Sequence, residues 1–349
     1  MNRFEYVSPE TIEGALTVLN GGEGARILAG GTDVLGEMKR GISSPSQLVN
    51  LKSIPELRGI RQDQDGSLTL GALTKLNEAA EHPAIVEHHP LLVQAISEVA
   101  SLQIRNIGSL GGNLCQRPRC VFFRHPDFHC YRKGGEGCFA ARGQSRCHAI
   151  FGERRCITVH PSDVAPALLA LEADVNIIST SGLRTISLDQ FFSVPREDCE
   201  RENILRQAEI LVEIRVPPPL PNARCIYLKV SERKAMDFAL ASVALVLCLE
   251  GRRVTQARVV LGGVAAAPWR ARDAESQLLD TEMEDEAIRH TCEAALKGAR
   301  PLRHNEYKIA LVKGLLRKAI KKLRLDNGQV RHRQIRCDSI VGRLHAASA

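Results

Sequence analysis

The sequence has few aromatic residues and no long apolar run. Only 4% of its 349 residues are Phe, Trp or Tyr, and Trp269 is the single tryptophan. No stretch approaches the roughly 20 consecutive apolar residues that a membrane-spanning helix needs. The first residues, MNRFEYVSPETIEGAL, contain neither the apolar core nor the cleavage site of a secretory signal. We therefore expect a chain without a membrane span or a secretory signal of its own.

Three familiar motifs are also missing. No two cysteines are separated by two residues, the spacing typical of paired zinc ligands. The glycine-rich segments match neither the GxGxxG fingerprint of Rossmann dinucleotide sites nor the P-loop. These absences argue against the commonest zinc and nucleotide sites, so any cofactor site must be of another kind.

Cysteine, by contrast, is concentrated in one segment. A segment this dense in cysteine is either a disulfide framework or a metal-binding loop. The odd total of eleven cysteines, the missing secretory signal and a chain long enough to build a large core all favour metal. Six cysteines fall within 42 residues: Cys115, Cys120, Cys130, Cys138, Cys147 and Cys156.

The composition and spacing of this segment favour an iron–sulfur cluster. The intervals between cysteines are long and uneven, as in a loop that folds around an object larger than one ion. A cluster held by four thiolates carries negative charge. Residues 117–155 supply nine Arg or Lys against three acidic residues, which suits such a cluster. Without the cysteines, a solvated basic loop would be the simpler interpretation.

Two glycine segments indicate a phosphate-bearing cofactor. Ala29-Gly-Gly-Thr-Asp33 follows a short predicted strand, and successive glycines leave the backbone free to form an anion-binding nest. Gly108, Gly111 and Gly112 form a second such turn, with Ser109 and Asn113 as polar neighbours. Either segment alone is more often just a tight turn.

The pair Ser162-Asp163 precedes a helix predicted over 164–171. It either caps this helix or contacts the same cofactor, and the two roles are compatible.

Length and periodicity predict two or three domains that mix helices and strands. Ser8 is the expected N-cap of the first helix, with Pro9 at its first position.

The residues Lys229, Arg233 and Asp237 are spaced four apart, as expected for a salt-bridged stripe on the surface of a helix. Helix 308–323 is amphipathic with a basic outer face, which either is solvated or docks on an acidic partner subunit. Further helices are expected at 74–80 and 89–100, strands at 26–29, 47–51 and 257–263, and a hairpin at 60–70 turning at Asp65-Gly66.

Seven motifs in a fixed order carry a family resemblance. They are AGGTD at 29–33, GALT at 71–74, IRNIGSLGGN at 104–113, HPSD at 160–163, KVSERKAMDFA at 229–239, VVLGGVAAAPWRA at 259–271 and PLRHNEYK at 301–308. Together they resemble the FAD-binding subunits of xanthine oxidase-family molybdenum hydroxylases. The medium subunit of carbon monoxide dehydrogenase is the minimal form of that family.

The resemblance spans about residues 3–325 and implies an α+β fold. It implies a two-part FAD-binding domain of the vanillyl-alcohol-oxidase (PCMH) type over 1–222, with subdomains at about 1–57 and 58–222. A carbon monoxide dehydrogenase flavoprotein C-terminal-like α/β domain over 223–328 follows, and then a basic tail over 329–349.

The minimal form has no cysteine loop, but two relatives do. These are the flavin subunits of 4-hydroxybenzoyl-CoA reductase and of bacterial three-subunit aldehyde oxidoreductases, where the loop binds a [4Fe-4S] cluster. The stretches GNLCQRPRC, FRHPDFHC, GGEGC and CITVHPSD are most similar to the aldehyde oxidoreductase type. The resemblance thus implies an insertion over 115–156 with Cys120, Cys130, Cys138 and Cys156 as ligands. Cys147 lies nine residues from both Cys138 and Cys156, so spacing alone leaves it, like Cys115, as a possible replacement.

The resemblance also implies a division of labour. A large subunit with the molybdenum cofactor would hydroxylate the substrate, an aldehyde that becomes a carboxylic acid. A small subunit with two [2Fe-2S] clusters would pass electrons to FAD in this chain and on to an external acceptor. No catalytic residue for the hydroxylation is expected here. The implied FAD contacts are Leu28, Ala29, Gly30, Gly31, Thr32, Asp33, Val34 and Leu35 at the pyrophosphate; Gly71 and Thr74; Ile107, Gly108, Ser109, Gly112 and Asn113 at the phosphates and ribityl chain; Asp163 at the ribityl or adenosine part; and Lys229 near the isoalloxazine.

Several alternatives stay open at this point. One alternative is the flavin subunit of a 4-hydroxybenzoyl-CoA reductase-like or other molybdenum hydroxylase. A second is a stand-alone FAD oxidase, and a third is a zinc-stabilised adaptor that binds nucleic acid. The cluster either exchanges single electrons with an outside partner or mainly orders its loop. Cofactor insertion predicts assembly in the cytoplasm, with export on a partner's twin-arginine signal to the periplasm as the alternative.

Overall fold

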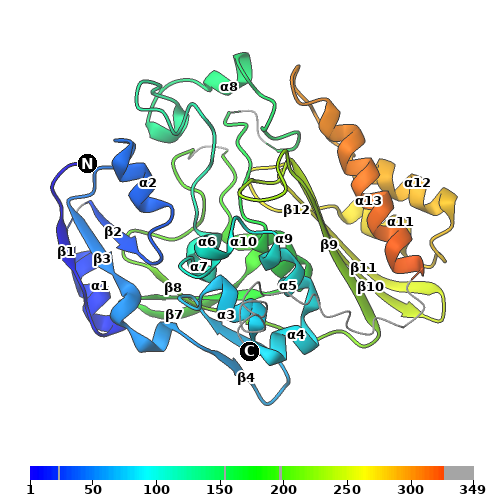
Figure 1. Cartoon of the computed structure of the whole chain (residues 1–349), viewed down its shortest axis with the longest axis horizontal. Coiled ribbons are helices and arrows are strands. Elements are labelled where there is room, and N and C mark those ends of the chain that lie inside the picture. Colours follow the sequence, from blue (N-terminus) through cyan, green and yellow to red (C-terminus); the bar gives the residue numbers. More distant parts are fainter. Residues whose placement is uncertain (23, 153–154, 196–198, 326–349) are drawn as a thin grey trace, which may run out of the picture.

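A small parallel sheet forms one end of the molecule (Figure 1). The computed structural model describes residues 1–22, 24–152, 155–195 and 199–325. In this sheet the strand order is β1-β3-β2 and both pairings are parallel. Ala15, Leu16 and Leu19 on one side of α1 are buried against it. The elements are β1 (Glu5–Val7), α1 (Ile12–Asn20), β2 (Ala25–Leu28), α2 (Val34–Lys39) and β3 (Gln47–Asn50), followed by the 3-10 helices η1 (Leu51–Ser53) and η2 (Pro55–Leu57).

A five-stranded antiparallel sheet forms the centre, with the order β4-β5-β8-β6-β7. Its first hairpin turns at Asp65-Gly66, as the sequence predicts, and Gly66 has a φ of +83° there. The strands are β4 (Ile60–Gln62), β5 (Leu68–Gly71), β6 (Asp174–Ser179), β7 (Gly182–Ser187) and β8 (Ile210–Val216). The helices that accompany it are α3 (Leu76–Glu81), α4 (Pro83–His88), α5 (Pro90–Ser97), α6 (Leu102–Arg105), α7 (Leu110–Leu114), α9 (Val164–Ala170) and α10 (Leu188–Phe191).

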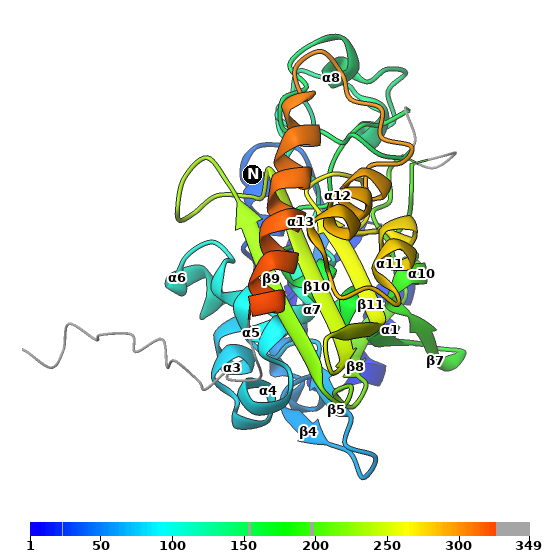
Figure 2. The ribbon, with the colours of Figure 1, turned by 90° about the vertical axis from the view of Figure 1, so that its right-hand side faces the viewer.

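The C-terminal part is a four-stranded antiparallel sheet of order β12-β11-β10-β9. Helix α13 lies along it, with α11 and α12 beside it (Figure 2). Helices α5 and α9 contact the same strands, so β10 is buried along almost its whole length. The elements are β9 (Ala223–Val230), β10 (Ala241–Glu250), β11 (Arg253–Gly262), β12 (Trp269–Arg270), α11 (Arg272–Leu278), α12 (Asp285–Ala294) and α13 (Tyr307–Leu325).

Between α7 and α9 the chain forms a long segment with little regular structure, seen above the sheets in Figure 1. It contains only η3 (Tyr131–Lys133) and α8 (Phe139–Arg142). This segment includes the six clustered cysteines, and no two cysteines of the described chain are joined in a disulfide. Its shape must therefore come from backbone hydrogen bonds, from side-chain contacts or from a bound group.

Two helix starts differ from the sequence-based expectation. Thr11, not Ser8, caps α1, because Thr11 is extended and its Oγ1 accepts a hydrogen bond from the N–H of Gly14. At α9 the hydroxyl of Ser162 accepts from the N–H of Ala165, and Asp163 makes no capping hydrogen bond. The Asp163 side chain is therefore free for another role.

The amphipathic helix predicted at 308–323 is present as α13. Across the described residues, no helix combines the length and apolarity needed to cross a membrane. The predicted basic tail at 329–349 lies outside the described residues.

Candidate functional site

A large cleft of about 1290 Å³ opens where the first sheet, the central sheet and the cysteine segment meet. This volume exceeds the roughly 300–1,000 Å³ of pockets for drug-sized ligands. Its walls include both glycine turns, Asp163, and the residues that begin the cysteine segment. The cleft is therefore large enough for an extended cofactor with several parts.

The two glycine turns touch each other inside this cleft. A Cβ atom on Gly30 would lie 2.4 Å from the carbonyl oxygen of Ile107, directly before Gly108 of the second turn. Gly111 packs the second turn against Ala72, since a Cβ on Gly111 would lie 2.8 Å from the Ala72 Cβ. Gly31 has a φ of +73°, which favours glycine. Only glycine permits this approach, and it exposes adjacent backbone to the cleft as a cradle for phosphate.

Most of the sequence-predicted contacts line the cleft. They are Ala29, Gly30, Gly31, Thr32, Asp33, Val34, Gly108, Ser109, Gly112, Asn113 and Asp163. The others support it from behind: Leu28 and Leu35 pack in a small core, Gly71 lies against the backbone of Leu57, and Thr74 donates to the carbonyl of Gly59. Ile107 is mostly exposed, and its carbonyl contacts Gly30.

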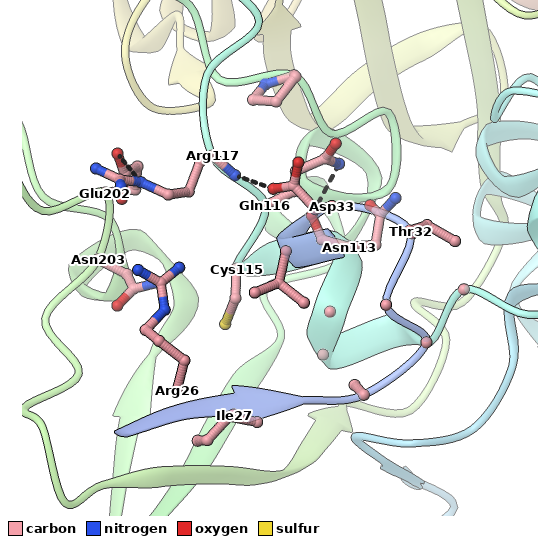
Figure 3. A pocket seen from close by; sticks show the side chains of 18 of the residues that line it. Arg26, Ile27, Thr32, Asp33, Asn113, Cys115, Gln116, Arg117, Glu202 and Asn203 are labelled. Carbon is pink, nitrogen blue, oxygen red and sulfur yellow. Dashed lines mark hydrogen bonds and ion pairs between the residues drawn. The ribbon is translucent and has the colours of Figure 1, made fainter. Parts of the chain in front are cut away.

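Asp33 fastens the first glycine turn to the cysteine segment. Its Oδ2 accepts a hydrogen bond of 2.7 Å from the backbone N–H of Arg117, as Figure 3 shows. Its Oδ1 lies 2.9 Å from Arg119 Nη1 and 2.8 Å from Arg124 Nη2. Behind it the buried Glu37 lies 3.3 Å from Arg124, and burial raises the pKa of Glu37. A cofactor on this turn would thus contact a site organised by the cysteine segment.

Asp163 and Lys229 form a buried ion pair at the opposite side of the cleft. Lys229 Nζ lies 2.7 Å from Asp163 Oδ2, and it also donates to the carbonyls of Glu98 and Asp237. The hydroxyl of Tyr227 donates to Asp163 Oδ1 at 2.9 Å. Burial raises the pKa of Asp163 to about 6, while Lys229 and Tyr227 oppose that rise.

Lys229 therefore stands behind the cleft wall and does not line it. It lies in β9, whereas Arg233 and Asp237 follow in the next loop, so these three residues do not form a helical stripe. Arg233 and Asp237 do form an ion pair at 3.7 Å. The surface-stripe interpretation is wrong because Lys229 turns inward to a buried carboxylate.

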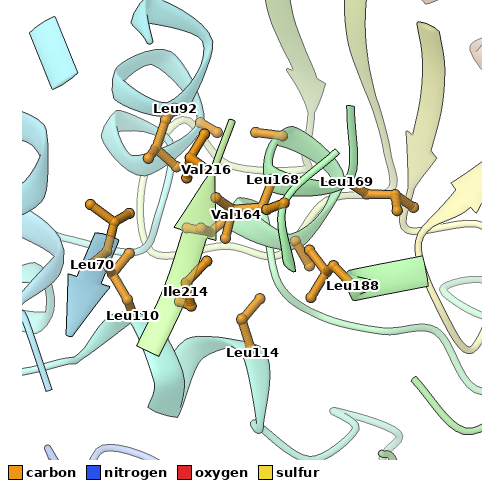
Figure 4. Close-up of a cluster of buried hydrophobic side chains, with 14 of the residues drawn as sticks. Leu70, Leu92, Leu110, Leu114, Val164, Leu168, Leu169, Leu188, Ile214 and Val216 are labelled. Carbon is orange, nitrogen blue, oxygen red and sulfur yellow. The ribbon is translucent and has the colours of Figure 1, made fainter. Parts of the chain in front are cut away.

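A dense apolar core holds Asp163 and the second glycine turn in place. Val164, Leu168 and Leu169 of α9 pack with Leu110 and Leu114 of α7, together with residues of β5 and β8 (Figure 4). All are almost fully buried. Because α7 carries Gly111, Gly112 and Asn113, and α9 begins after Asp163, this core fixes both cleft walls relative to each other.

Four of the six clustered cysteines surround a second, small apolar cavity. Cys120, Cys130, Cys138 and Cys156 line it, together with Phe122, Phe123, Tyr131, Arg132, Phe139, Ala140 and Thr158. These are the four that the resemblance selects. Cys147 is exposed elsewhere, and Cys115 lines the large cleft instead.

The four thiols surround a space and do not converge on a point. Within the described residues, no three His, Cys, Asp or Glu side chains lie close enough to share a single metal ion. The expectation of a metal-binding group is thus not met for one ion. Four thiols around one cavity match an iron–sulfur cluster in the type and number of its ligands.

Two buried side-chain nitrogens face these sulfurs. Arg132 Nε lies 3.3 Å from Cys156 Sγ, and His148 Nε2 lies 3.2 Å from Cys120 Sγ. Burial raises the pKa of Cys120 to about 11 and lowers that of His148 to about 4, so the protein alone favours an uncharged thiol beside an uncharged ring. The iron ions of a bound cluster would supply the positive charge that stabilises thiolates at this site.

The sequence did not single out Arg132, His148, Arg124 or Glu202. From the sequence, the arginines of the cysteine segment count only as bulk positive charge, and Glu202 lies outside the segment. Their roles depend on contacts between residues far apart in the chain. Arg132 and Glu202, for example, are separated by 70 positions.

Comparison with known proteins agrees with this geometry. The family model described as FAD binding domain in molybdopterin dehydrogenase matches residues 2–219, and the CO dehydrogenase flavoprotein C-terminal domain matches residues 226–323. The chain is 34% identical to the aldehyde oxidoreductase FAD-binding subunit PaoB of Escherichia coli K12, over 90% of this chain and 96% of that one. It is 30% identical to the carbon monoxide dehydrogenase medium chain of Hydrogenophaga pseudoflava, over 91% and 96%.

A solved structure confirms the expected fold. The carbon monoxide dehydrogenase from Hydrogenophaga pseudoflava that lacks the Mo-pyranopterin moiety of its cofactor superposes with a TM-score of 0.74 at 27% identity, covering 92% of this chain and 96% of that one. The family and fold predicted from the sequence are therefore confirmed. This chain belongs to the family of FAD-binding medium subunits of molybdenum-containing hydroxylases, and it is an oxidoreductase subunit with an FAD-binding domain.

Proposed function

We propose that this chain carries both FAD and a [4Fe-4S] cluster and transfers electrons within a heterotrimeric aldehyde oxidoreductase. The observation that supports it most is the ring of Cys120, Cys130, Cys138 and Cys156 around one cavity beside the FAD cleft. The aldehyde specificity is supported by the 34% identity to an aldehyde oxidoreductase subunit.

The residues of the cleft fit FAD as a binding site. The touching glycine turns present backbone to the pyrophosphate, and Asp163 faces the cleft from the start of α9. FAD bound here would accept electrons one at a time from the [2Fe-2S] clusters and release them singly or in pairs. The chain's own residues bind and orient the cofactor, and none of them is assigned to substrate hydroxylation.

The proposal assigns the remaining steps to partners. A large subunit holds the molybdenum cofactor and converts the aldehyde to a carboxylic acid. A small subunit with two [2Fe-2S] clusters delivers electrons to FAD, and an external acceptor removes them. The complex assembles in the cytoplasm, with or without later export to the periplasm on a partner's signal.

Iron counting on the purified complex tests the cluster assignment. The wild-type complex should contain four more iron atoms than the two [2Fe-2S] clusters account for. Cys130→Ser should lose those four and keep the [2Fe-2S] electron paramagnetic resonance signals. Cys147→Ser is the matched control, because Cys147 is exposed away from the cavity, and it should keep full iron. Equal iron in Cys130→Ser and wild type would contradict the assignment.

Kinetics of the same variant test the electron-transfer role. If the cluster passes electrons outward, Cys130→Ser should reduce FAD normally with aldehyde but turn over slowly with one-electron acceptors. Normal turnover with every acceptor, despite the lost iron, would contradict the electron-transfer role. The cluster would then serve only to order its loop.

A further inference from the structure

One side chain borders both cofactor sites. Arg132 lines the small cysteine cavity and also the large FAD cleft. Its side chain is 2% exposed, so it is not part of the solvated basic surface of the loop. It follows Cys130 by two residues, in the short helix η3.

The contacts of Arg132 are directed to both sides. Its Nε lies 3.3 Å from Cys156 Sγ. Its Nη1 lies 2.8 Å from Glu202 Oε1, which also accepts from Arg117 Nε at 3.1 Å. Arg117 in turn donates its backbone N–H to Asp33 in the first glycine turn. A continuous chain of polar contacts thus runs from Cys156 to the turn that cradles the FAD phosphates.

Along this series of polar contacts, positive side chains outnumber the one carboxylate between them. Arg132 is the arginine that contacts a sulfur, whereas Glu202 shares one carboxylate between Arg132 and Arg117. The Arg132 guanidinium stays charged although it is buried, because an arginine is not deprotonated in proteins. In a buried site with low dielectric, a fixed positive charge against a sulfur acts strongly on the adjacent redox group.

We propose that Arg132 is a positioning residue that sets the reduction potential of the cluster, and that Glu202 limits its effect. The inference rests on the proposed function, since it requires a cluster on the four cysteines. A cluster held by the four cysteines would gain a negative charge on one-electron reduction, and Arg132 would stabilise that charge through its own charge and its N–H···S contact with Cys156. Arg132 therefore raises the potential and favours electron flow toward the cluster, and Glu202 partly offsets it.

Redox titration of the intact complex tests this without relying on turnover. Arg132→Gln should lower the reduced-to-oxidised ratio of the cluster at least tenfold at a fixed potential, about 59 mV for one electron. Glu202→Gln should shift the ratio in the opposite direction, because Arg132 keeps its charge and loses the nearby negative one. Arg132→Lys should fall between wild type and Arg132→Gln, since it keeps the charge but not the planar fork.

A charge control separates local from general effects. Arg142 is exposed in α8 of the same segment, so Arg142→Gln should leave the ratio unchanged. Iron is measured in every variant. The inference would be overturned if Arg132→Gln kept its iron and showed the wild-type ratio of reduced to oxidised cluster. It would also be overturned if all three variants at Arg132 and Glu202 lost the cluster iron, because these residues would then have a purely structural role. A wild-type complex without the additional iron would instead refute the proposed function itself.

Discussion

Lys229 Nζ lies 2.7 Å from Asp163 Oδ2, and this contact joins the C-terminal sheet to the wall of the large cleft. Lys229 belongs to β9 and Asp163 precedes α9, with 66 positions between them. Both side chains are nearly inaccessible, at 2% and 5% exposure. The C-terminal sheet therefore contributes directly to the charge balance at the wall of the large cleft.

Breaking this pair should be costly. Lys229→Met leaves a buried carboxylate with only Tyr227 as a partner, and removing one member of a buried pair costs about 3–5 kcal/mol. Denaturant unfolding measures the loss. Lys234→Met, an exposed lysine in the next loop, should change stability by less than about 0.5 kcal/mol. The double variant Asp163→Asn, Lys229→Met should recover part of the loss, and strict additivity would argue against the pair.

The pH dependence of stability should carry the signature of Asp163. In the unfolded chain its carboxyl loses a proton near pH 4, and in the folded protein near pH 6 because burial raises the pKa. Between these values the folded state binds more protons, so stability falls as the pH rises from about 4 to about 6. Asp163→Asn should remove a slope on the order of 2–3 kcal/mol across that window. Asp273→Asn, at an exposed site in α11, should keep it.

The contact between the glycine turns should be essential for FAD. In Gly30→Ala the new Cβ would clash with the carbonyl of Ile107 at 2.4 Å, so the two turns must move apart. We expect FAD affinity to fall at least tenfold, about 1.4 kcal/mol, as measured by flavin fluorescence. Gly36→Ala is the control in α2, because its Cβ would meet no atom within 4 Å. Equal affinity in both variants would mean that the turns do not cradle the cofactor.

Asp33 should couple the FAD cleft to the cysteine segment. Asp33→Ala leaves Arg119 and Arg124 without their shared carboxylate, and both flavin and cluster iron should be retained less well through gel filtration. Asp33→Asn keeps an oxygen for the N–H of Arg117 and should be milder. Asp65→Ala changes an exposed aspartate of the β4–β5 hairpin, which also pairs with an arginine, and should retain both cofactors. Loss of flavin with full retention of iron would contradict the coupling.

Much of the local structure was predictable from sequence. The helix at α13, the hairpin at Asp65-Gly66 and the strand ending at Gly262 follow from apolar periodicity and turn residues, which act over a few positions. The N-cap of α1 was misplaced because Ser8 and Thr11 are both good caps. Ser8 instead accepts a hydrogen bond from the side chain of Asn50, 42 positions away.

The order of residues supplies two glycine turns, a segment with six cysteines, and an ordered set of motifs that identifies the family. Folding in three dimensions settles which of these features meet. It placed Gly30 against Ile107, excluded Cys115 and Cys147 from the small cavity, and moved Lys229 behind Asp163. It also brought Arg132 between the large cleft and the small cysteine cavity. The physical reason is that backbone propensities act between near neighbours, whereas buried ion pairs and cavities form only where packing joins distant segments.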